Sequence, residues 1–412
     1  MIEKIGRQAR EAARVVATTS TATKNDALEA MAAALEASVE EILAANAGDV
    51  TRAHTLEIGD ALMDRLTLTD ARLASMAAGL RKVAGLPDPI GVATGGWTMP
   101  NDIRVQRVRA PLGVVAVIYE ARPNVTADAG GLAFKAGNAA ILRGSSYALG
   151  SNQAVAAALR SGLESAGLPA DAIQLLEDTS REAAAELMQA TEWVDLLVPR
   201  GGPGLIQAMI DNATVPYVID GAGNCHVYVD EAADLEKAKA ITVNAKISRP
   251  AVCNAAESLL VHEAVAAKFI PEVAAELIEN GVELRGDELT QELVPQAGKA
   301  SDEDYGTEFH DLIMSIKVVP SVAAAVDHIL EHGSGHTDAI VSEDYGAIDT
   351  FVRGVDSAVT MVNASTRFTD GEEFGFGAEI GISTQKLHVR GPMGLEALTC
   401  ERYVLYGTGQ VR

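Results

Sequence analysis

The sequence predicts an α/β protein with parallel sheets, because short apolar runs alternate with helical segments along most of the chain. Val114–Ile118 and Ala139–Leu142 are two such runs, made of Val, Ile, Leu and Ala. Runs of this kind mark strands buried on both faces, and strands that alternate with helices form βαβ units. A second alternating region follows Leu235. We therefore expect two α/β regions joined near residues 220–234, an arrangement in which ligands usually bind between the domains.

Outside these regions the chain is expected to be helical at first and then to form exposed strands. Residues 1–85 should be helical, and Asp26–Ala45 repeats apolar residues at helical spacing. Gly85–Asn101 is rich in Gly and Pro and predicts a loop. Ile103–Ala110 alternates apolar and mostly basic residues, which predicts a strand with one wet face or an edge open to a partner. Leu398–Tyr406 predicts another exposed strand.

Each α/β region has its own series of expected elements. The strands of the first region are Val114–Ile118, Ala139–Leu142, Ile173–Leu176, Val194–Val198, Val215–Ile219 and Val227–Val229. Its helices are Thr126–Lys135, Asn152–Ala166, Ser180–Gln189 and Gly204–Asn212. The strands of the second region are near Ser258–Val261, Leu312–Val319, Ala339–Val341 and Val359–Val362. Its helices are near Leu235–Ala245, Ala264–Glu279, Ser321–Glu331 and Ala347–Val352.

Composition excludes several classes of protein and of partner. The 412 residues include 33 basic and 57 acidic side chains, for a net charge of −24, and 48% of them are apolar. This is a globular composition, which argues against disorder, collagen and disulfide scaffolds. The acidity argues against nucleic acid and anionic membrane surfaces as partners. An anionic small molecule could still be the ligand if Arg and Lys cluster in a local pocket.

Cysteine usage and the absence of an apolar leader favour a reducing, cytoplasmic location. The three cysteines are odd in number and widely spaced, and they form neither a disulfide framework nor a zinc pattern. The N-terminal residues contain no apolar signal core, and the longest uncharged apolar stretch is far shorter than a membrane span. Two of the three cysteines, Cys225 and Cys400, are expected to be structural.

Cys253 is the best candidate for a nucleophile. Arg249 and, slightly earlier, Lys246 place positive charge near it. Positive charge and free backbone N–H groups favour the thiolate, which is the reactive form of cysteine. The alternative from local sequence is a buried structural cysteine, since free cysteine is among the most buried residue types.

Three glycine-containing turns could approach a phosphate or a ribose. Residues 199–205 follow an expected strand and open an expected helix, where backbone N–H groups favour an anion. Their spacing is not G-x-G-x-x-G. Residues 220–224 and 143–146 also end expected strands. Each turn could equally be an ordinary connection, so the ligand is not specified by these features alone.

No metal centre is expected. His332 and His336 flank Gly333–Gly335, but no carboxylate pair is placed to complete a site. A Ser-His-Asp pattern with a nucleophile elbow is also missing from the sequence.

Taken together, these segments resemble the aldehyde dehydrogenase superfamily over nearly the whole chain. More narrowly, they resemble its branch that reduces glutamyl phosphate. Two runs, 333–340 and 390–395, are marks of that branch rather than of aldehyde dehydrogenases at large. The other segments that carry the resemblance are 111–114, 119–126, 135–138, 142–144, 199–202, 220–226, 249–254 and 375–384.

The resemblance implies a fold of two parallel-sheet α/β domains with a small β oligomerisation flap. Residues 1–95 and 112–222 would form the cofactor-binding domain, and residues 223–385 the catalytic domain. Residues 96–111 and 386–412 would supply the flap and a C-terminal return. Since the flap extends between subunits in this superfamily, a homo-oligomer is expected.

The resemblance also implies roles for individual residues. Cys253 matches the catalytic thiol, and Asn124 matches the side chain that forms an oxyanion hole together with the Cys253 backbone N–H. The residues expected to bind the cofactor, NADP(H), are Arg143, Gly144 and Ser145 at the adenosine ribose, Gly201, Gly202 and Gly204 beside the nicotinamide and pyrophosphate, and Glu308 at the nicotinamide ribose. Arg249 and Lys246 are candidates for the substrate phosphate on charge and position alone.

Two positions depart from the hydrolytic members of the superfamily. Asp220 stands where they carry a Glu that activates water, and Arg143 stands where they carry a Lys. A shorter carboxylate suits an enzyme that must not hydrolyse its acyl-enzyme, but it leaves Asp220 without an assigned role.

The implied reaction is the NADPH-dependent reduction of L-glutamyl 5-phosphate to L-glutamate 5-semialdehyde plus phosphate, through a cysteine thioester, in L-proline biosynthesis. Functional coupling to glutamate 5-kinase is expected, because acyl phosphates are short-lived. One alternative is another acyl-phosphate or semialdehyde dehydrogenase with a different substrate. Another is a non-catalytic nucleotide-binding protein, in which Cys253 would tolerate replacement and resist alkylation.

Overall fold

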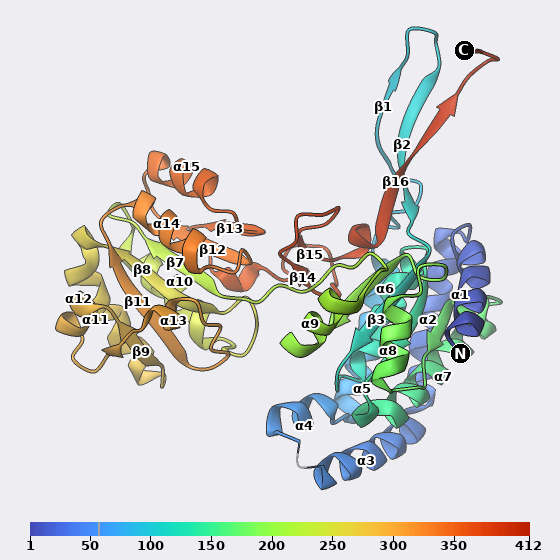
Figure 1. The fold of residues 1–412 in the computed structure, drawn as a ribbon, viewed down its shortest axis with the longest axis horizontal. Coiled ribbons are helices and arrows are strands. Elements are labelled where there is room, and N and C mark those ends of the chain that lie inside the picture. Colours follow the sequence, from blue (N-terminus) through green and yellow to red (C-terminus); the bar gives the residue numbers. More distant parts are fainter. Residues whose placement is uncertain (57) are drawn as a thin grey trace. The chain divides into compact units, whose positions relative to one another are not determined.

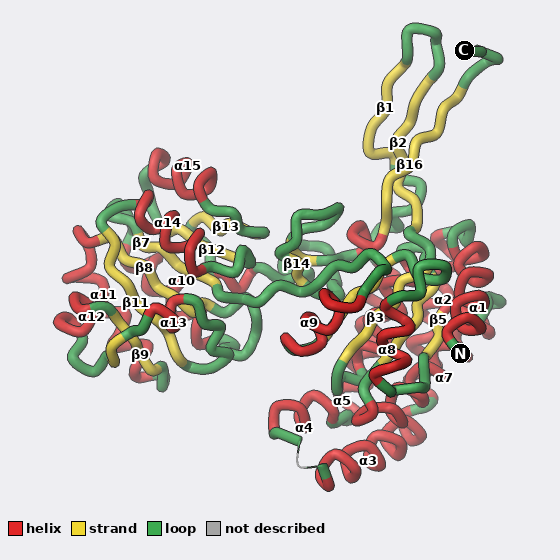
Figure 2. Tube along the Cα trace, in the orientation of Figure 1, coloured by secondary structure: helices red, strands yellow, loops and turns green. Residues whose placement is uncertain are grey.

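The computed structural model describes residues 1–56 and 58–412. The chain forms two compact units. Unit 1 consists of Met1–Ile219, Gly375–Gly381 and Met393–Arg412, and unit 2 of Asp220–Phe374 and Ile382–Pro392. Figure 1 labels the elements of both units, and Figure 2 colours the same trace by secondary structure. None of the helices in the described ranges is long and apolar enough to cross a membrane.

Unit 1 begins with the helical segment that the periodicity predicts. Ser20 and Thr69 end the loops before two of these helices, and each side chain accepts a backbone N–H of the first turn. The five helices are α1 (Ile2–Val16), α2 (Thr21–Ala37), α3 (Val39–Thr55), α4 (Asp60–Leu66) and α5 (Asp70–Gly85).

A four-stranded parallel sheet forms the centre of unit 1, with the order β5-β4-β3-β6. Its strands are β3 (Val114–Tyr119), β4 (Ala139–Arg143), β5 (Ile173–Leu175) and β6 (Leu196–Arg200). The connections contain α6 (Asn124–Lys135), η1 (Ser146–Ala148), α7 (Leu149–Ser165), η2 (Ala170–Ala172) and α8 (Arg181–Met188), and α9 (Pro203–Asn212) follows β6. Because the chain moves outward from β3 to β5 and then returns to β6, the strand order reverses beside β3.

Alternate residues of β3 explain why its sequence is apolar throughout. Val114, Ala116 and Ile118 pack in one core with Ala9 and Ala13 of α1. All six residues of β3 are buried, so the intervening residues are covered as well. A strand covered on both faces needs no polar face.

A three-stranded antiparallel sheet, the flap, also belongs to unit 1. It has the order β1-β2-β16, with β1 (Ala93–Thr98), β2 (Arg104–Pro111) and β16 (Thr399–Tyr406), and η4 (Leu395–Leu398) precedes β16. The prediction of strands at β2 and β16 is confirmed. The expected loop Gly85–Asn101 contains β1, and this makes β2 the central strand rather than an edge.

Unit 2 contains a seven-stranded parallel sheet with the order β10-β9-β11-β8-β7-β12-β13. Its strands are β7 (Cys225–Val229), β8 (Ala256–His262), β9 (Glu283–Gly286), β10 (Gly298–Lys299), β11 (Ile313–Val319), β12 (Thr337–Val341) and β13 (Val359–Val362). The two parallel sheets confirm the predicted α/β class.

Helices cover both faces of this sheet. Tyr228, Leu260 and Ile340 form one core with residues of α14 and α15, whereas the strand residues next to them pack with α10 and α11. The helices are α10 (Leu235–Ile247), α11 (Glu263–Glu279), α12 (Glu288–Leu293), α13 (Asp302–Tyr305), α14 (Val322–His332) and α15 (Tyr345–Gly354). The remaining elements are η3 (Thr366–Phe368), β14 (Ile382–Ser383) and β15 (Gly391–Pro392).

Three details differ from the sequence-based expectations. Val215–Ile219 is not a named strand, since only Tyr217 bridges Leu197. Gly375–Gly381, expected in the catalytic domain, belongs to unit 1, where Gly377 packs on Leu86. Residues 386–392, expected with the flap, belong to unit 2. The chain therefore passes between the units more often than the expected boundaries imply.

Candidate active site

The amino end of the unit 2 sheet holds the candidate thiol. Cys253 lies in a turn between α10 and β8 and is half-buried, whereas Cys225 is buried and Cys400 is exposed. The turn is closed by the Ala255 N–H, which donates to the Val252 carbonyl at 3.0 Å. A partly exposed cysteine in a short turn can present its sulfur to a substrate, which a buried structural cysteine cannot.

The glycine-rich segment before β7 packs directly on this turn. A Cβ on Gly223 would overlap the carbonyl of Cys253, so only glycine allows the approach. The Cys225 thiol donates to the same carbonyl at 3.2 Å. Burial, and next the nearby charge of Asp338, raise the pKa of Cys225. Cys225 is therefore a buried support for the turn, as predicted.

Arg367 of η3 spans the Cys253 turn and was missed by sequence reasoning. Its Nε donates to the Ser248 hydroxyl at 3.0 Å, and its Nη1 donates to the Asn254 side-chain oxygen. The Asn254 amide in turn donates to the Thr369 carbonyl at 2.9 Å. Burial, and then the charge of Arg249, lower the pKa of Arg367, whereas Cys253 acts in the opposite direction. Two arginines thus lie beside the candidate thiol.

Lys246 does not have the place that sequence reasoning gave it. Its ammonium is fully buried and lies 2.5 Å from a carboxylate oxygen of Glu257, which is also fully buried. Burial lowers the pKa of Lys246 and raises that of Glu257 to about 7. An ammonium enclosed with its own carboxylate cannot receive a substrate phosphate, so Lys246 is removed from the phosphate candidates.

Glu308 lies close to the same turn. Its carboxylate accepts the Gly223 N–H, and its Oε2 lies 3.4 Å from His310 Nε2. The other oxygen, Oε1, is buried and has no hydrogen-bond partner among the residues that the structure describes. Burial raises the pKa of this carboxyl group. A buried acceptor without a partner fits a ligand hydroxyl, such as that of a ribose.

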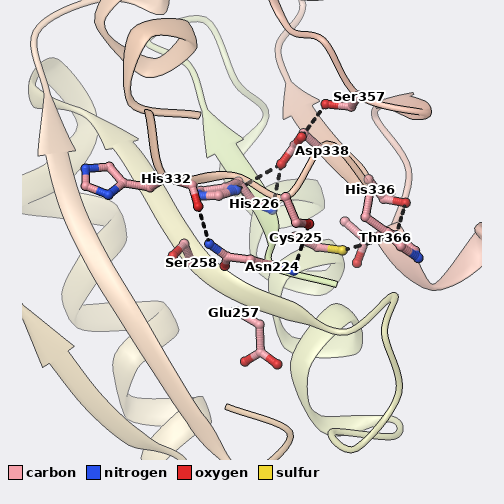
Figure 3. A network of polar contacts seen from close by, with 12 residues as sticks. Asn224, Cys225, His226, Glu257, Ser258, His332, His336, Asp338, Ser357 and Thr366 are labelled. Carbon is pink, nitrogen blue, oxygen red and sulfur yellow. Dashed lines mark hydrogen bonds and ion pairs between the residues drawn. The ribbon is translucent and has the colours of Figure 1, made fainter. Parts of the chain in front are cut away.

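A buried polar network supports the amino ends of β7 and β12 (Figure 3). Asp338 accepts from the His226 backbone N–H at 3.0 Å, lies 2.9 Å from His226 Nδ1 and accepts the Ser357 hydroxyl. The Asn224 side chain donates to the carbonyls of Tyr305 and His332 at 2.8 and 2.9 Å. These bonds hold the segment that presses on Cys253. The sequence signal for them was Asp338, an acidic residue in the buried strand β12.

His336 is part of this support. Its side chain is fully buried, and Nδ1 lies 2.9 Å from the Thr337 hydroxyl and 3.7 Å from the Cys225 sulfur. Burial lowers the pKa of His336 to about 4, so the ring is neutral near pH 7. His336 is thus a buried residue of the loop before β12, whereas His332 is the last residue of α14.

In unit 1 the expected cofactor residues meet at the carboxyl edge of the sheet. Arg143 ends β4, and Gly201 follows β6, while β3 pairs with both strands: Ile118 aligns with Arg143 and Tyr119 with Arg200. This is the point where the strand order reverses, which is the usual ligand position in open α/β sheets. Gly202 is the N-cap of α9.

Some hydrogen-bonding groups at this edge are used within the protein, and others have no partner in the ranges that the structure describes. Arg143 Nη2 donates to the Thr179 and Ser180 carbonyls at 2.6 and 3.0 Å. Arg143 Nε and the Ser145 hydroxyl are buried and have no hydrogen-bond partner within residues 1–56 and 58–412. Gly144 has no room for a side chain, because a Cβ there would overlap Asn152.

The glycines that follow β6 differ in what surrounds them. A Cβ on Gly201 would come within 2.8 Å of the Glu120 side chain, and Glu120 accepts the Gly202 N–H at 3.1 Å. A Cβ on Gly204 would meet open space. Any need for glycine at Gly204 would therefore come from a molecule outside the chain. The unpartnered groups of Arg143 and Ser145 and the open position at Gly204 lie at or after the carboxyl ends of β4 and β6 in unit 1.

Asn124 begins α6 and has an exposed side chain. Its amide donates to Asp128 Oδ2 at 2.9 Å, one helical turn further along. Burial raises the pKa of Asp128 to about 6. One of the two N–H groups of Asn124 is thus used to fix the orientation of its amide.

Asp220, which sequence reasoning left without a role, is the first residue of unit 2. It forms an antiparallel bridge with Ser383, and the neighbouring Gly221 N–H donates to the Ile382 carbonyl at 3.0 Å. Its backbone therefore joins 382–383 to the segment that leads to Gly223.

Comparison with known proteins confirms the resemblance. Residues 1–291 match the model of the aldehyde dehydrogenase family. The gamma-glutamyl phosphate reductase of Moorella thermoacetica is 54% identical over 411 residues, covering 100% of this chain and 98% of the relative. That of Heliobacterium modesticaldum is 55% identical over 407 residues, covering 99% and 98%.

A solved structure extends the match to the fold. The crystal structure of the gamma-glutamyl phosphate reductase of Thermotoga maritima is 45% identical, with a TM-score of 0.98, and covers 100% of this chain and 99% of that one. The expected fold, with its parallel-sheet α/β domains, is therefore confirmed. The chain belongs to the aldehyde dehydrogenase family, and within it to the gamma-glutamyl phosphate reductases.

Proposed function

We propose that this chain reduces L-glutamyl 5-phosphate to L-glutamate 5-semialdehyde with NADPH and releases phosphate, as a step of L-proline biosynthesis. The observation that carries the proposal is the Cys253 turn, which presents a half-buried thiol beside Arg249, Arg367 and the unpartnered oxygen of Glu308. The relatives that share 54% and 55% of its residues over their full length are named for this reduction.

In the first step, the Cys253 thiolate attacks the acyl carbon. The bond from that carbon to the phosphate oxygen breaks, its electron pair leaves with the phosphate, and a thioester forms. Phosphate is a good leaving group, so no base is needed to activate it. A water-activating carboxylate would be harmful here, because water would hydrolyse the thioester.

In the second step, the thioester on Cys253 is reduced. When bound, the nicotinamide supplies a hydride to the thioester carbon. The resulting thiohemiacetal oxygen re-forms the carbonyl, and the electron pair of the C–S bond returns to Cys253 as thiolate. Negative charge builds on the same oxygen in both steps. We assign its stabilisation to the Cys253 backbone N–H and the Asn124 amide, at about 3 kcal/mol for each donor.

The family membership supports a nicotinamide dinucleotide as the cofactor. We assign its adenosine ribose to Arg143–Ser145 and its nicotinamide ribose to Glu308. Its pyrophosphate side is assigned to Gly201, Gly202 and Gly204. The preference for NADPH over NADH rests on the positive charge of Arg143, whose Nε has no hydrogen-bond partner in the described part of the chain.

Further parts of the proposal concern the cellular setting. A catalytic thiolate requires a reducing compartment, which supports the cytoplasm. An acyl phosphate hydrolyses readily, so coupling to the glutamate 5-kinase that makes it is expected. The flap supports a homo-oligomer, because its strands expose large apolar side chains.

The decisive experiment measures NADPH formation from the semialdehyde, NADP⁺ and inorganic phosphate. Cys253→Ala is expected to abolish this activity, while Cys400→Ser, which changes an exposed flap residue, should keep it. Turnover by Cys253→Ala would refute the thioester mechanism. A wild-type enzyme that prefers NADH would refute the assignment of Arg143.

A further inference from the structure

The guanidinium of Arg367 is held rigidly over the thiol turn of unit 2. Its Nε donates to Ser248, which precedes Cys253 in the chain, and its Nη1 donates to Asn254, which follows it. Two side-chain to backbone bonds join the same segments: the Thr366 hydroxyl donates to the Asn254 backbone carbonyl at 2.7 Å, and the Asn254 side-chain amide donates to the Arg367 backbone carbonyl at 3.4 Å. The side chain therefore cannot leave the turn without breaking both of its hydrogen bonds.

The two bonds of the guanidinium go to neutral partners, a hydroxyl and an amide oxygen. The charge of Arg367 is thus placed but not neutralised by them. Arg249 lies close enough for its charge to disfavour that of Arg367. Arg367 is half-buried and Arg249 is exposed. The nearby charges of Asp370, Cys253 and Glu373 offset part of the repulsion between the two arginines. A bound anion would offset it further. In a chain with a net charge of −24, such a concentration of positive charge is unusual.

A second pair of cations in unit 2 already has a carboxylate partner, although Arg390 Nε is buried with no hydrogen-bond partner among the described residues. Lys386 and Arg390 line a cavity of about 250 Å³ together with Ser334 and Thr384. Both cations are already paired with Asp356, at 3.0 Å in the case of Arg390. They therefore have less electrostatic need for an anionic ligand than Arg249 and Arg367 have.

We propose that Arg367 and Arg249 together bind the phosphoryl group of the acyl phosphate, so that the departing phosphate leaves the acyl carbon between two guanidinium groups. This inference rests on the proposed function. Arg367 takes the role that charge and sequence position gave to Lys246.

The phosphoryl group fits this place better than the carboxylate of the substrate. The bond that breaks joins the phosphate to the carbon that the sulfur attacks, so cations beside the sulfur lie beside the leaving group. The substrate carboxylate is several bonds further away. A phosphate also carries more negative charge than a carboxylate and accepts the paired N–H groups of arginine.

The test uses the reverse reaction, in which inorganic phosphate is a substrate. At saturating semialdehyde and NADP⁺, Arg367→Gln and Arg249→Gln should each raise the KM for phosphate at least tenfold, and the KM for semialdehyde should change much less. Arsenate as a substitute for phosphate should show the same loss. The matched control is Arg353→Gln, an exposed arginine of α15 paired with Asp349, which should behave as the wild type.

Two further measurements keep the proposal falsifiable. Arg367→Gln can disturb the turn, so its thermal midpoint is compared with the wild type, and if it is lowered, Arg249→Gln decides. Arg367→Lys keeps the positive charge but loses the paired N–H donors of the guanidinium. Its KM for phosphate is expected to lie between those of the wild type and Arg367→Gln. Wild-type activity that does not depend on phosphate would sink the proposed function itself. Phosphate-dependent wild-type activity with unchanged phosphate KM in both glutamine variants, or a rise in the semialdehyde KM alone, would overturn only the arginine pair.

Discussion

At the scale of single residues, the clearest constraint is the contact between Gly223 and the carbonyl of Cys253. Because a Cβ would overlap that carbonyl, Gly223→Ala must displace the thiol turn. We expect a loss in kcat/KM of about 10²-fold, since small misplacements of reacting groups have effects of this size. Gly85→Ala, at a position with nothing within 4 Å, is the control and should retain full activity.

The measurement is steady-state kinetics together with the rate of Cys253 alkylation by iodoacetamide. Both should fall in Gly223→Ala. If the alanine variant kept wild-type values for both, the segment 220–224 would be only a linker, as one interpretation of the sequence allowed.

A second residue-scale prediction separates a donor from the residue that orients it. Asn124→Ala removes a proposed oxyanion donor and should lower kcat about 10²-fold. Asp128→Ala removes only the acceptor that fixes the Asn124 amide, so a loss of about tenfold is expected. Neither substitution should change the alkylation rate of Cys253. Equal kcat in Asn124→Ala and wild type would remove Asn124 from the mechanism.

Residue assignments from sequence fail where a buried partner decides the role of a side chain. The catalytic role of Cys253 stays a prediction, and the structure shows that its side chain is partly exposed in a turn. Lys246 failed, because sequence shows a charge but not that Glu257 encloses it. Arg367 was missed because it is distant from Cys253 in the chain and reaches the turn only through the fold.

At the scale of elements, the strands of the flap leave large apolar side chains exposed. Trp97 of β1 and Tyr403 of β16 contact each other edge-on, with 6.1 Å between ring centroids, and yet each is more than half exposed. Leu405 is also 56% exposed. Apolar residues on a narrow ribbon favour burial against another copy of the chain.

We therefore expect Tyr403→Glu/Leu405→Glu to lower the molecular mass in solution, because a charge would be buried at the contact. Analytical ultracentrifugation measures the change. Val352→Glu, which alters an exposed valine of α15, is the control and should leave the mass unchanged. An oligomer that survives the double substitution would place the subunit contact elsewhere.

The elements themselves were predictable to the extent that one strong pattern marks them. The buried strands of both parallel sheets follow from runs of Val, Ile and Leu. β1 was missed because Gly95 and Gly96 are not typical strand residues. The strand forms because it pairs with β2. Val215–Ile219 was wrongly predicted as a strand. Val215 and Val218 are buried, but an apolar run can be buried without pairing with a neighbouring strand.

At the scale of the whole molecule, buried histidines should make folding sensitive to acid. Burial, and next the charges of His226, Lys317 and His332, lower the pKa of His328 to about 2. In the unfolded chain its pKa returns to about 6.5. The unfolded state then binds the proton first, so this stabilising contribution is present above pH 6.5 and is lost progressively as the pH falls below it.

The expected slope for one such group is about 1.4 kcal/mol of unfolding free energy per pH unit. His328→Phe removes that group, so its stability should fall less steeply between pH 6.5 and 5 than that of the wild type. Urea unfolding followed by circular dichroism at several pH values measures both slopes. Parallel slopes in the two proteins would show that His328 does not titrate on unfolding.

The pairing of β2 with β16 has a consequence for the order in which the protein is made. Thr399 lies opposite Pro111 and Tyr406 opposite Arg104, so the two strands are separated by all of unit 2 in the chain. A nascent polypeptide on the ribosome therefore exposes one side of the β1-β2 hairpin until β16 emerges. During that interval unit 2 can already fold around its own sheet, and the hairpin is the part most open to wrong pairing or to a chaperone.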